Sequence, residues 1–406
     1  MNLKKNVKNG FLIFLLVFGT YGIYFLYRID KPVIIKPFPD PFIFNNGTQV
    51  KDEEDWQARR EEIKELLLDE EYGHMPGRPD ALNATEISSE VRADGSIAKV
   101  VELSIIPSNE TPNTMINFII WIYIPSGAGP FPTIVKVGKD GIGSEPEMNQ
   151  KIVSRGYIYV CYSYTDLEPD TMGYDVDGPC QAAYPGYDWG SIAVWAWGAM
   201  RVADYLLGEI WVNAPDGIPN VDSDKLIITG HSRRGKTALL AGALDERFAM
   251  VAPNGSGCGG AGSFLVQGYL CETIATISSE SRWKSWFQED FNKYGNNEKD
   301  LTFDQHFLLA LVAPRIIFST NKFEDFWQNP VGTQAIYEAV APVFEFLGVE
   351  ENNAIHYSHG IHSFIEEDFE VIMDLADKLL LGKDVSGDFY MTPYDIDFKI
   401  DYEIPD

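Results

Sequence analysis

Residues 225–240 read KLIITGHSRRGKTALL, and this stretch decides the fold class. Its apolar beginning is typical of a buried strand, and its end begins a segment with helical periodicity. A sharp turn from a strand into a helix exposes a serine hydroxyl, here Ser232, at the carboxyl edge of a parallel sheet, where sites of open α/β sheets lie. The general pattern of such a turn is G-x-S-x-G. Here Arg234 occupies its last position, and glycine follows as Gly235.

The rest of the chain extends this reading. Apolar runs between turn-rich segments predict strands, and runs with a period near 3.6 residues predict helices. From about residue 130 onward the two alternate, which predicts a largely parallel sheet covered by helices on both faces, after an antiparallel start. The expected strands are 98–106, 117–124, 132–137, 157–163, 225–229, 248–252 and 314–319, and the expected helices are 56–68, 190–207, 236–247 and 365–381.

The N-terminal segment differs from the remainder. Residues 11–27 form an uncharged apolar run with basic residues on both sides, which predicts a transmembrane anchor or an uncleaved signal over 1–30. Basic residues before the run favour an N-terminus inside and a body outside the cytoplasm, membrane-anchored, or secreted if the segment is cleaved. A linker is expected at 31–55, one α/β domain at 56–390 and an acidic tail at 391–406.

Composition excludes several classes of function. The 406 residues include 32 Lys and Arg against 60 Asp and Glu, a formal net charge of −28, so binding to nucleic acid is excluded. The sequence contains neither CxxC nor HExxH, and no metal or organic cofactor is expected. Residues 255–260 (GSGCGG) match G-x-G-x-x-G, but no clear helix follows, so a tight turn beside the site is the better interpretation.

A serine nucleophile needs a base and an acid that orients the base, and in α/β-hydrolases they follow the serine in the order acid, then histidine. His362 belongs to a group with His356 and His359 ahead of the last expected helix. Glu324 and Asp325 follow the strand at 314–319, so either is placed to be the acid. The competing interpretation is that Ser232 caps a helix and that the carboxylates lie in a solvated loop.

Three cations follow the serine. Arg233, Arg234 and Lys236 occupy the first helical turn, where the macrodipole disfavours positive charge by ~0.3–1 kcal/mol each. Such a local conflict indicates a function, and cations beside a nucleophile suit an anionic substrate or an oxyanion. The alternative is that they pair with carboxylates elsewhere in this acidic chain.

The stretch GHSRRGKTALLAGALDERFAMVAPNGSGCGG at 230–260 resembles carbohydrate esterase family 15, the glucuronoyl esterases, in particular their bacterial branch. That family carries an S-R-x-G-K serine turn, which accounts for the displaced glycine. The resemblance covers roughly residues 60–385. It continues through YPGYDWGSIAVWAWGAMR (184–201), DQHFLLALVAPR (304–315), EDFWQNP (324–330) and HGIHSF (359–364).

The resemblance implies a serine esterase of the α/β-hydrolase fold. Its substrate would be the ester of 4-O-methyl-glucuronic acid in glucuronoxylan with lignin alcohols, and we expect a monomer whose only membrane contact is the N-terminal segment. The implied catalytic residues are Ser232 as nucleophile, His362 as base and Arg233 at the oxyanion; Lys236, Glu272 and Trp327 would contact the sugar.

The sequence departs from the family at the acid. Many members carry a glutamate directly before the Ser-Gly of the glycine-rich turn, and here that position is Gly255. Asp325 would then serve, with Glu324 as the other choice. Two other functions remain open: a general carboxylesterase or acetylxylan esterase on the same fold, and a membrane-tethered carbohydrate-binding relative without catalysis.

Overall fold

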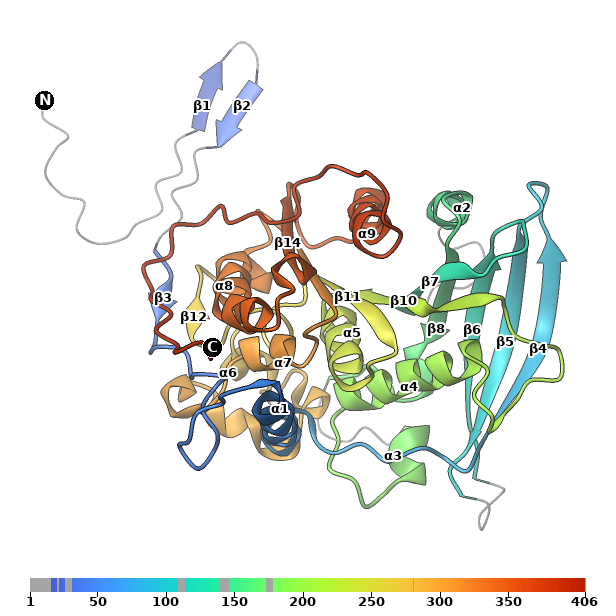
Figure 1. Ribbon diagram of the computed structural model, residues 1–406, viewed down its shortest axis with the longest axis horizontal. Coiled ribbons are helices and arrows are strands. Elements are labelled where there is room, and N and C mark those ends of the chain that lie inside the picture. The colour runs from blue at the N-terminus through green and yellow to red at the C-terminus, as the bar shows by residue number, and fades with distance from the viewer. Residues whose placement is uncertain are drawn as a thin grey trace, which may run out of the picture.

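A large sheet forms the centre of the molecule (Figure 1). The computed structural model describes residues 16–19, 22–25, 31–108, 114–138, 146–172, 178–279 and 281–405. Within them, ten strands pair in the order β14-β13-β11-β10-β7-β8-β6-β5-β4-β9. These strands are β4 (Ala81–Val91), β5 (Ile97–Ile106), β6 (Ile116–Ile124), β7 (Phe131–Gly138), β8 (Ile158–Ser163), β9 (Val212–Asn213), β10 (Val221–His231), β11 (Phe248–Asn254), β13 (Ile316–Lys322) and β14 (Asn353–Ser358).

The sheet is mixed, as the sequence predicts. Every neighbouring pair from β14 to β8 is parallel, whereas β8, β6, β5 and β4 pair antiparallel. The short strand β9 then pairs parallel with β4. Because β4, β5 and β6 come first along the chain among the strands of this sheet, the expected antiparallel start and the largely parallel remainder are both confirmed. The carboxyl ends of β10, β11 and β13 consequently lie side by side.

Helices cover both faces of the sheet, which confirms the second part of the fold prediction. The α-helices are α1 (Glu53–Leu67), α2 (Pro146–Ser154), α3 (Pro179–Ala183), α4 (Ser191–Leu206), α5 (Arg233–Leu244), α6 (Ile274–Ile277), α7 (His306–Ala310), α8 (Pro330–Phe346) and α9 (Glu366–Leu379). Short 3-10 or π turns are η1 (Leu68–Tyr72), η2 (Tyr164–Asp166), η3 (Lys284–Trp286), η4 (Glu289–Tyr294), η5 (Glu298–Asp300), η6 (Phe326–Gln328) and η7 (Glu350–Asn352).

Each face of the sheet packs against its own hydrophobic cluster. On one face α2 and α9 pack on the sheet through residues such as Ile152 and Ile372. On the other face α4, α5 and α8 form the larger cluster, to which α1 and α7 also contribute. In Figure 1, α2 and α9 lie above the sheet and α4 and α5 below it. Burial of apolar surface on both sides holds the parallel strands in register.

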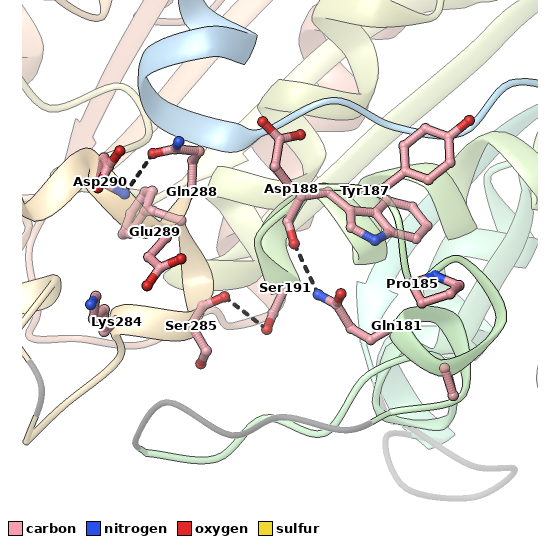
Figure 2. Close-up of a pocket in the computed structure, with 13 residues that line it drawn as sticks. Gln181, Pro185, Tyr187, Asp188, Ser191, Lys284, Ser285, Gln288, Glu289 and Asp290 are labelled. Carbon is pink, nitrogen blue, oxygen red and sulfur yellow. Dashed lines mark hydrogen bonds between the residues drawn. The ribbon is translucent and has the colours of Figure 1, made fainter.

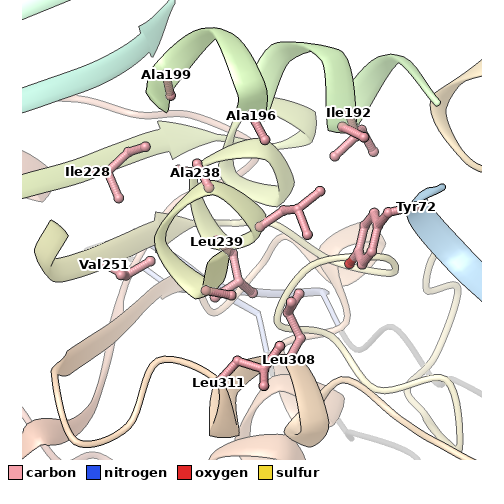
Figure 3. Packing of buried hydrophobic residues seen from close by; sticks show 14 of the residues in the cluster. Tyr72, Ile192, Ala196, Ala199, Ile228, Ala238, Leu239, Val251, Leu308 and Leu311 are labelled. Carbon is pink, nitrogen blue, oxygen red and sulfur yellow. The ribbon is translucent and has the colours of Figure 1, made fainter. Parts of the chain in front are cut away.

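The packing of α4 against α5 positions the start of α5. Figure 3 shows Ala196 and Ala199 of α4 near Ala238 of α5, above Ile228 of β10 and Val251 of β11. All five side chains are fully buried. Small residues at a helix contact let the two axes approach closely. The cluster therefore packs α5 tightly between α4 and the sheet and fixes the position of the N-terminus of α5.

Two segments that the sequence assigns outside the domain pack against it. Within the expected linker, 31–55, Phe42 and Val50 are buried, β3 (Val33–Ile34) pairs with β12 (Val266–Gln267), and α1 already begins at Glu53. Tyr402 of the expected tail contacts the larger cluster. These segments therefore belong to the packed body, because their few apolar residues find matching surfaces on α1, α7 and α8.

The expected membrane anchor lies mostly outside the described residues. The two parts that are described, β1 (Leu16–Gly19) and β2 (Gly22–Phe25), form an antiparallel pair rather than a helix. Among the described residues, none of the helices has the length and apolar character needed to cross a bilayer. The prediction of a transmembrane helix over 1–30 thus gains no support from the structure.

Candidate active site

Ser232 occupies the sharp turn between β10 and α5. Its backbone has φ 59° and ψ −127°, a region that is strained for a residue with a side chain. The turn is held by hydrogen bonds from the Ser232 amide to Asn254 O (3.0 Å) and from the Gly235 amide to Ser232 O (2.8 Å). The Ser232 side chain makes no capping hydrogen bond to α5, so the interpretation of this residue as a simple helix cap is wrong.

The displaced glycine performs the function that the general motif requires. A Cβ on Gly230 would lie 2.3 Å from Arg234 O, and one on Gly235 would lie 2.9 Å from Asn254 O. Both distances are shorter than a van der Waals contact, so only glycine fits at either position without moving the backbone of this tight turn. The turn therefore keeps its geometry although Gly235 stands three residues after Ser232 instead of two.

The two candidate acids are distinguished by their partners. His362 Nδ1 donates a hydrogen bond to Asp325 Oδ2 at 2.5 Å, and the Asp325 side chain is only 4% exposed. Glu324 instead accepts hydrogen bonds from His359 Nδ1 (2.8 Å) and the Gly360 amide (2.7 Å). Burial alone would raise the pKa of Glu324, but these two donors hold it below its usual value. The geometry thus pairs Asp325, and not Glu324, with His362.

His231 brings His362 to the serine turn. The rings of these two histidines lie 4.3 Å apart between centroids, and His231 directly precedes Ser232. His231 Nδ1 donates to Asn254 Oδ1 at 2.7 Å. Burial, followed by the proximity of His362, lowers the pKa of His231 to about 3, so its ring is neutral. The sequence offered one hint of this role, the position of His231 inside the turn motif.

A buried ion pair fixes the loop that carries His362. Lys322 at the end of β13 donates to Ser358 Oγ (2.9 Å) at the end of β14 and to Asp368 Oδ1 (2.7 Å) in the first turn of α9. Both charged side chains are nearly inaccessible, at 3% and 2% exposed. The loop 359–365 is therefore held at both ends, which preserves the contact between His362 and its carboxylate.

Gly255, at the position where many family members have an acid, faces a filled space. Its φ is +49°, and a Cβ there would lie 2.3 Å from Gln328 Oε1. The Gln328 side chain is buried and donates through Nε2 to Lys322 O at 3.0 Å. A side chain at position 255 would therefore displace Gln328, while Asp325 approaches His362 from the end of β13.

Arg233, which the sequence places beside the nucleophile, is partnered. Its Nε donates to Asp170 Oδ2 at 2.5 Å, and the same oxygen accepts a hydrogen bond from the Tyr164 hydroxyl at 2.9 Å. The guanidinium carbon lies 5.5 Å from the ring centroid of Trp286. Burial would lower the pKa of Arg233, but Asp170 outweighs it and raises the pKa. The sequence analysis missed Asp170, which lies 63 positions earlier and carries no motif.

Lys236 is likewise paired, and its side chain is 2% exposed. Its Nζ donates to Ser256 O and Cys258 O, each at 2.6 Å, and to Glu272 Oε2 at 2.7 Å. Burial raises the pKa of Glu272, and Lys236 opposes this shift. Three donors with three acceptors saturate the ammonium group, so the predicted cluster of cations consists largely of paired charges.

The predicted sugar-contacting residues lie next to one another. The Glu272 amide donates to Trp327 O at 2.8 Å, which joins the two backbones. The Trp327 ring lies 5.6 Å from the guanidinium of Arg282, which also lies 5.5 Å from Trp283. Trp283 in turn stacks on Trp286 at 4.6 Å. Contacts between rings and guanidinium groups thus connect Trp327 through Arg282, Trp283 and Trp286 to Arg233. The sequence analysis had identified only Trp327 among these three tryptophans.

The structure therefore brings a serine on a strained turn, a histidine bonded to a buried carboxylate, and a partnered arginine to one edge of the sheet. A family model described as "Glucuronyl esterase, fungi" matches residues 108–348, more than half of the chain. The chain belongs to the glucuronoyl esterase family. As a glucuronoyl esterase relative it falls among the carboxylic ester hydrolases, and the resemblance seen in its sequence is confirmed.

Individual relatives agree with this family. The 4-O-methyl-glucuronoyl methylesterase of Schizophyllum commune is 30% identical over 378 residues, covering 89% of this chain and 88% of that enzyme. The 4-O-methyl-glucuronoyl methylesterase of Podospora anserina is 30% identical over 325 residues; the match covers 77% of this chain but only 61% of that protein. A glucuronoyl esterase of carbohydrate esterase family 15 from Caldicellulosiruptor kristjansonii superposes with a TM-score of 0.75 at 30% identity, over 89% of this chain and 95% of that one.

Proposed function

We propose that this protein is a serine esterase that hydrolyses esters of (4-O-methyl-)glucuronic acid in glucuronoxylan with lignin alcohols. The observation that carries the proposal is the hydrogen bond between His362 and buried Asp325, beside the Ser232 turn of a glucuronoyl esterase relative. A base whose second nitrogen is held by a buried carboxylate has the orientation that proton transfer to and from a serine requires.

The reaction would proceed in two acyl-transfer steps. His362 accepts the Ser232 hydroxyl proton while the serine oxygen attacks the C6 carbonyl of the uronate ester, and Asp325 stabilises the imidazolium that forms. The alcohol leaves with the proton from His362. Water, deprotonated by His362, then attacks the acyl-enzyme and releases the uronic acid and the free serine. No metal or organic cofactor takes part in these steps.

Arg233 would act at the oxyanion. Its Nε is occupied by Asp170, and a terminal guanidinium nitrogen would donate to the carbonyl oxygen as negative charge develops there. A single donor in such a site contributes ~3 kcal/mol to transition-state stabilisation. The Asp170 hydrogen bond and the Trp286 ring, 5.5 Å from the guanidinium carbon, would restrain the Arg233 side chain and so preorganise this donor.

Glu272 and Trp327 would bind the sugar, and Lys236 would act through Glu272 because its three donors are already occupied. Glu272 Oε2 is occupied by Lys236, and Oε1 is left to accept a hydrogen bond from a glucuronate hydroxyl. Lys236 would support this contact by holding the carboxylate ionised and in place. Trp327 would supply an apolar face for the ring carbons of the sugar.

We also propose that the protein acts outside the cytoplasm as a monomer, with residues 1–30 attaching it to the membrane. The support is the uncharged run at 11–27 with basic residues before it. Fractionation of cells that express the full chain and a form lacking 1–30 tests this. Recovery of both forms in the same soluble fraction would refute the attachment.

Hydrolysis of benzyl glucuronate by the full chain tests the activity, with 4-nitrophenyl acetate as the competing substrate and Ser232→Ala as the inactive reference. We expect uronate turnover that Ser232→Ala abolishes, and a much lower efficiency with the acetyl ester. Preference for the acetyl ester would support the general esterase instead. Binding of glucuronoxylan without turnover of either ester would support a non-catalytic binding protein.

A further inference from the structure

A cavity of about 640 Å³ lies between two segments that are far apart in the sequence. One wall comes from α3, the start of α4 and the residues between them, around Tyr187, and the other from segment 284–290. Figure 2 shows Gln181 and Tyr187 on one wall and Lys284 and Glu289 on the other. The volume falls within the ~300–1,000 Å³ of small-ligand sites. None of the residues placed in the candidate active site lines it.

The cavity is structurally connected to the candidate active site. Ser191 Oγ, at the start of α4, donates to Ser285 O at 3.1 Å and joins the two walls. Ser285 and Phe287 line the cavity, and Trp286 between them lies under the Arg233 guanidinium at 5.5 Å. A single turn of chain thus has the cavity on one side and the arginine beside Ser232 on the other.

The polar lining selects a class of ligand. Asp188, Glu289 and Asp290 are carboxylates that accept hydrogen bonds and repel anions, and Lys284 is the cation among the lining residues. Glu289 and Asp290 are exposed, so their oxygens are open to a ligand. Such a lining suits a neutral molecule with many hydroxyl donors and disfavours a carboxylate, the product of ester hydrolysis.

The aromatic lining favours the same ligand. Tyr187 is 42% exposed, and its ring leans on Trp189 (6.1 Å between centroids) and Tyr184 (5.8 Å), which hold it in place. A partly exposed aromatic ring that is held in place can pack against the C–H face of a sugar ring. The neighbouring carboxylates can accept hydrogen bonds from the hydroxyl groups of the same sugar. Polyols, which lack a ring face, would bind the carboxylates but would not pack against the tyrosine ring.

We propose that this cavity binds the neutral polysaccharide chain that bears the esterified uronate, as a subsite separate from the one that holds the uronate itself. This inference rests on the proposed function. It assigns to Tyr187, Glu289 and Asp290 the recognition of the chain, while Ser232 and His362 act on the side-chain ester. The cavity would then contribute to binding of a polymeric substrate and nothing to binding of a short synthetic ester.

Kinetics of the full chain with two esters test the subsite. One is benzyl glucuronate, which has no polysaccharide chain; the other is the methyl ester of 4-O-methyl-glucuronosyl-xylotetraose. For Tyr187→Ala we expect the ratio of KM for the oligosaccharide ester to KM for benzyl glucuronate to rise about tenfold, with kcat for the oligosaccharide ester retained. Tyr390→Ala, which removes a tyrosine of similar exposure (39%) outside the cavity, is the matched control. An unaltered KM ratio in folded Tyr187→Ala would overturn the proposal.

A binding measurement separates this inference from the proposed activity. Calorimetric titration of xylohexaose into full-length Ser232→Ala should show binding that Glu289→Ala weakens and Tyr390→Ala does not. Such binding without any ester turnover by the wild-type chain would leave the subsite standing and refute the esterase. Ester turnover with no xylohexaose binding, or with binding indifferent to Tyr187→Ala and Glu289→Ala, would refute the subsite alone.

Discussion

Replacement of Asp325 by asparagine tests the assignment of the acid. The Asp325 carboxylate contacts His362 Nδ1 at 2.5 Å and is 4% exposed, whereas the histidine ring is 40% exposed. With about 4 Å between charge centres and an effective dielectric constant near 20, the carboxylate stabilises a developing imidazolium by ~4 kcal/mol. Since ~1.4 kcal/mol corresponds to a factor of ten in rate, we expect kcat to fall about a thousandfold.

The assay is the kcat for benzyl glucuronate across pH, with Glu324→Gln as a matched control. Glu324→Gln keeps an acceptor for the Gly360 amide and leaves the His362 contact intact, so its kcat should stay within about tenfold of wild type. Circular dichroism would establish that both variants fold. If Asp325→Asn lost less than tenfold while Glu324→Gln lost a thousandfold, the assignment of the acid from this geometry would be refuted.

Three further predictions concern stability. Lys322→Met leaves Asp368 buried without its partner, so the free energy of unfolding in urea should fall by about 3–5 kcal/mol; an unchanged urea midpoint would contradict this. Burial raises the pKa of Glu71 from 4.5 in the unfolded chain to about 8, so the folded form holds a proton that the unfolded form has lost, and stability must fall between about pH 5 and 8. Glu71→Gln should therefore lose less stability than wild type between pH 6 and pH 9, and equal losses would argue against a buried proton. Gly255→Ala should cost about 1–3 kcal/mol through the close approach to Gln328, and Gln328→Ala in the same chain should recover part of it; strictly additive losses would disprove the contact.

The sequence predicts the fold well where periodicity is strong. Strands such as β5 and β7 and helices such as α4 lie within one or two residues of their predicted bounds, because long apolar runs leave little choice of period. Neither β14, with sequence NAIHYS, nor α8 was among the expected elements. Burial of Phe42 was equally hidden, because it depends on the rings of Trp56 and Phe346 rather than on neighbours in sequence.

In the candidate site too, local motifs predict some residues, whereas other contacts form only in the folded chain. Ser232 and His362 stand in local motifs from which the sequence predicts their catalytic roles, and those roles stay predictions. The sequence alone could not distinguish Glu324 from Asp325 as the partner of His362, because adjacent residues on a turn contact different partners in the folded chain. The partner of Arg233 was beyond any motif, because an ion pair across 63 residues has no local signature.

The pairing of the cations beside Ser232 bears on how the catalytic cycle ends. Arg233 with Asp170, and Lys236 with Glu272, form a group of zero net charge inside a chain of net charge −28. A neutral ester adds no charge to this group, but its hydrolysis creates a carboxylate there. The new carboxylate gains no net Coulomb attraction from these two ion pairs, so they should contribute little to product inhibition by uronate.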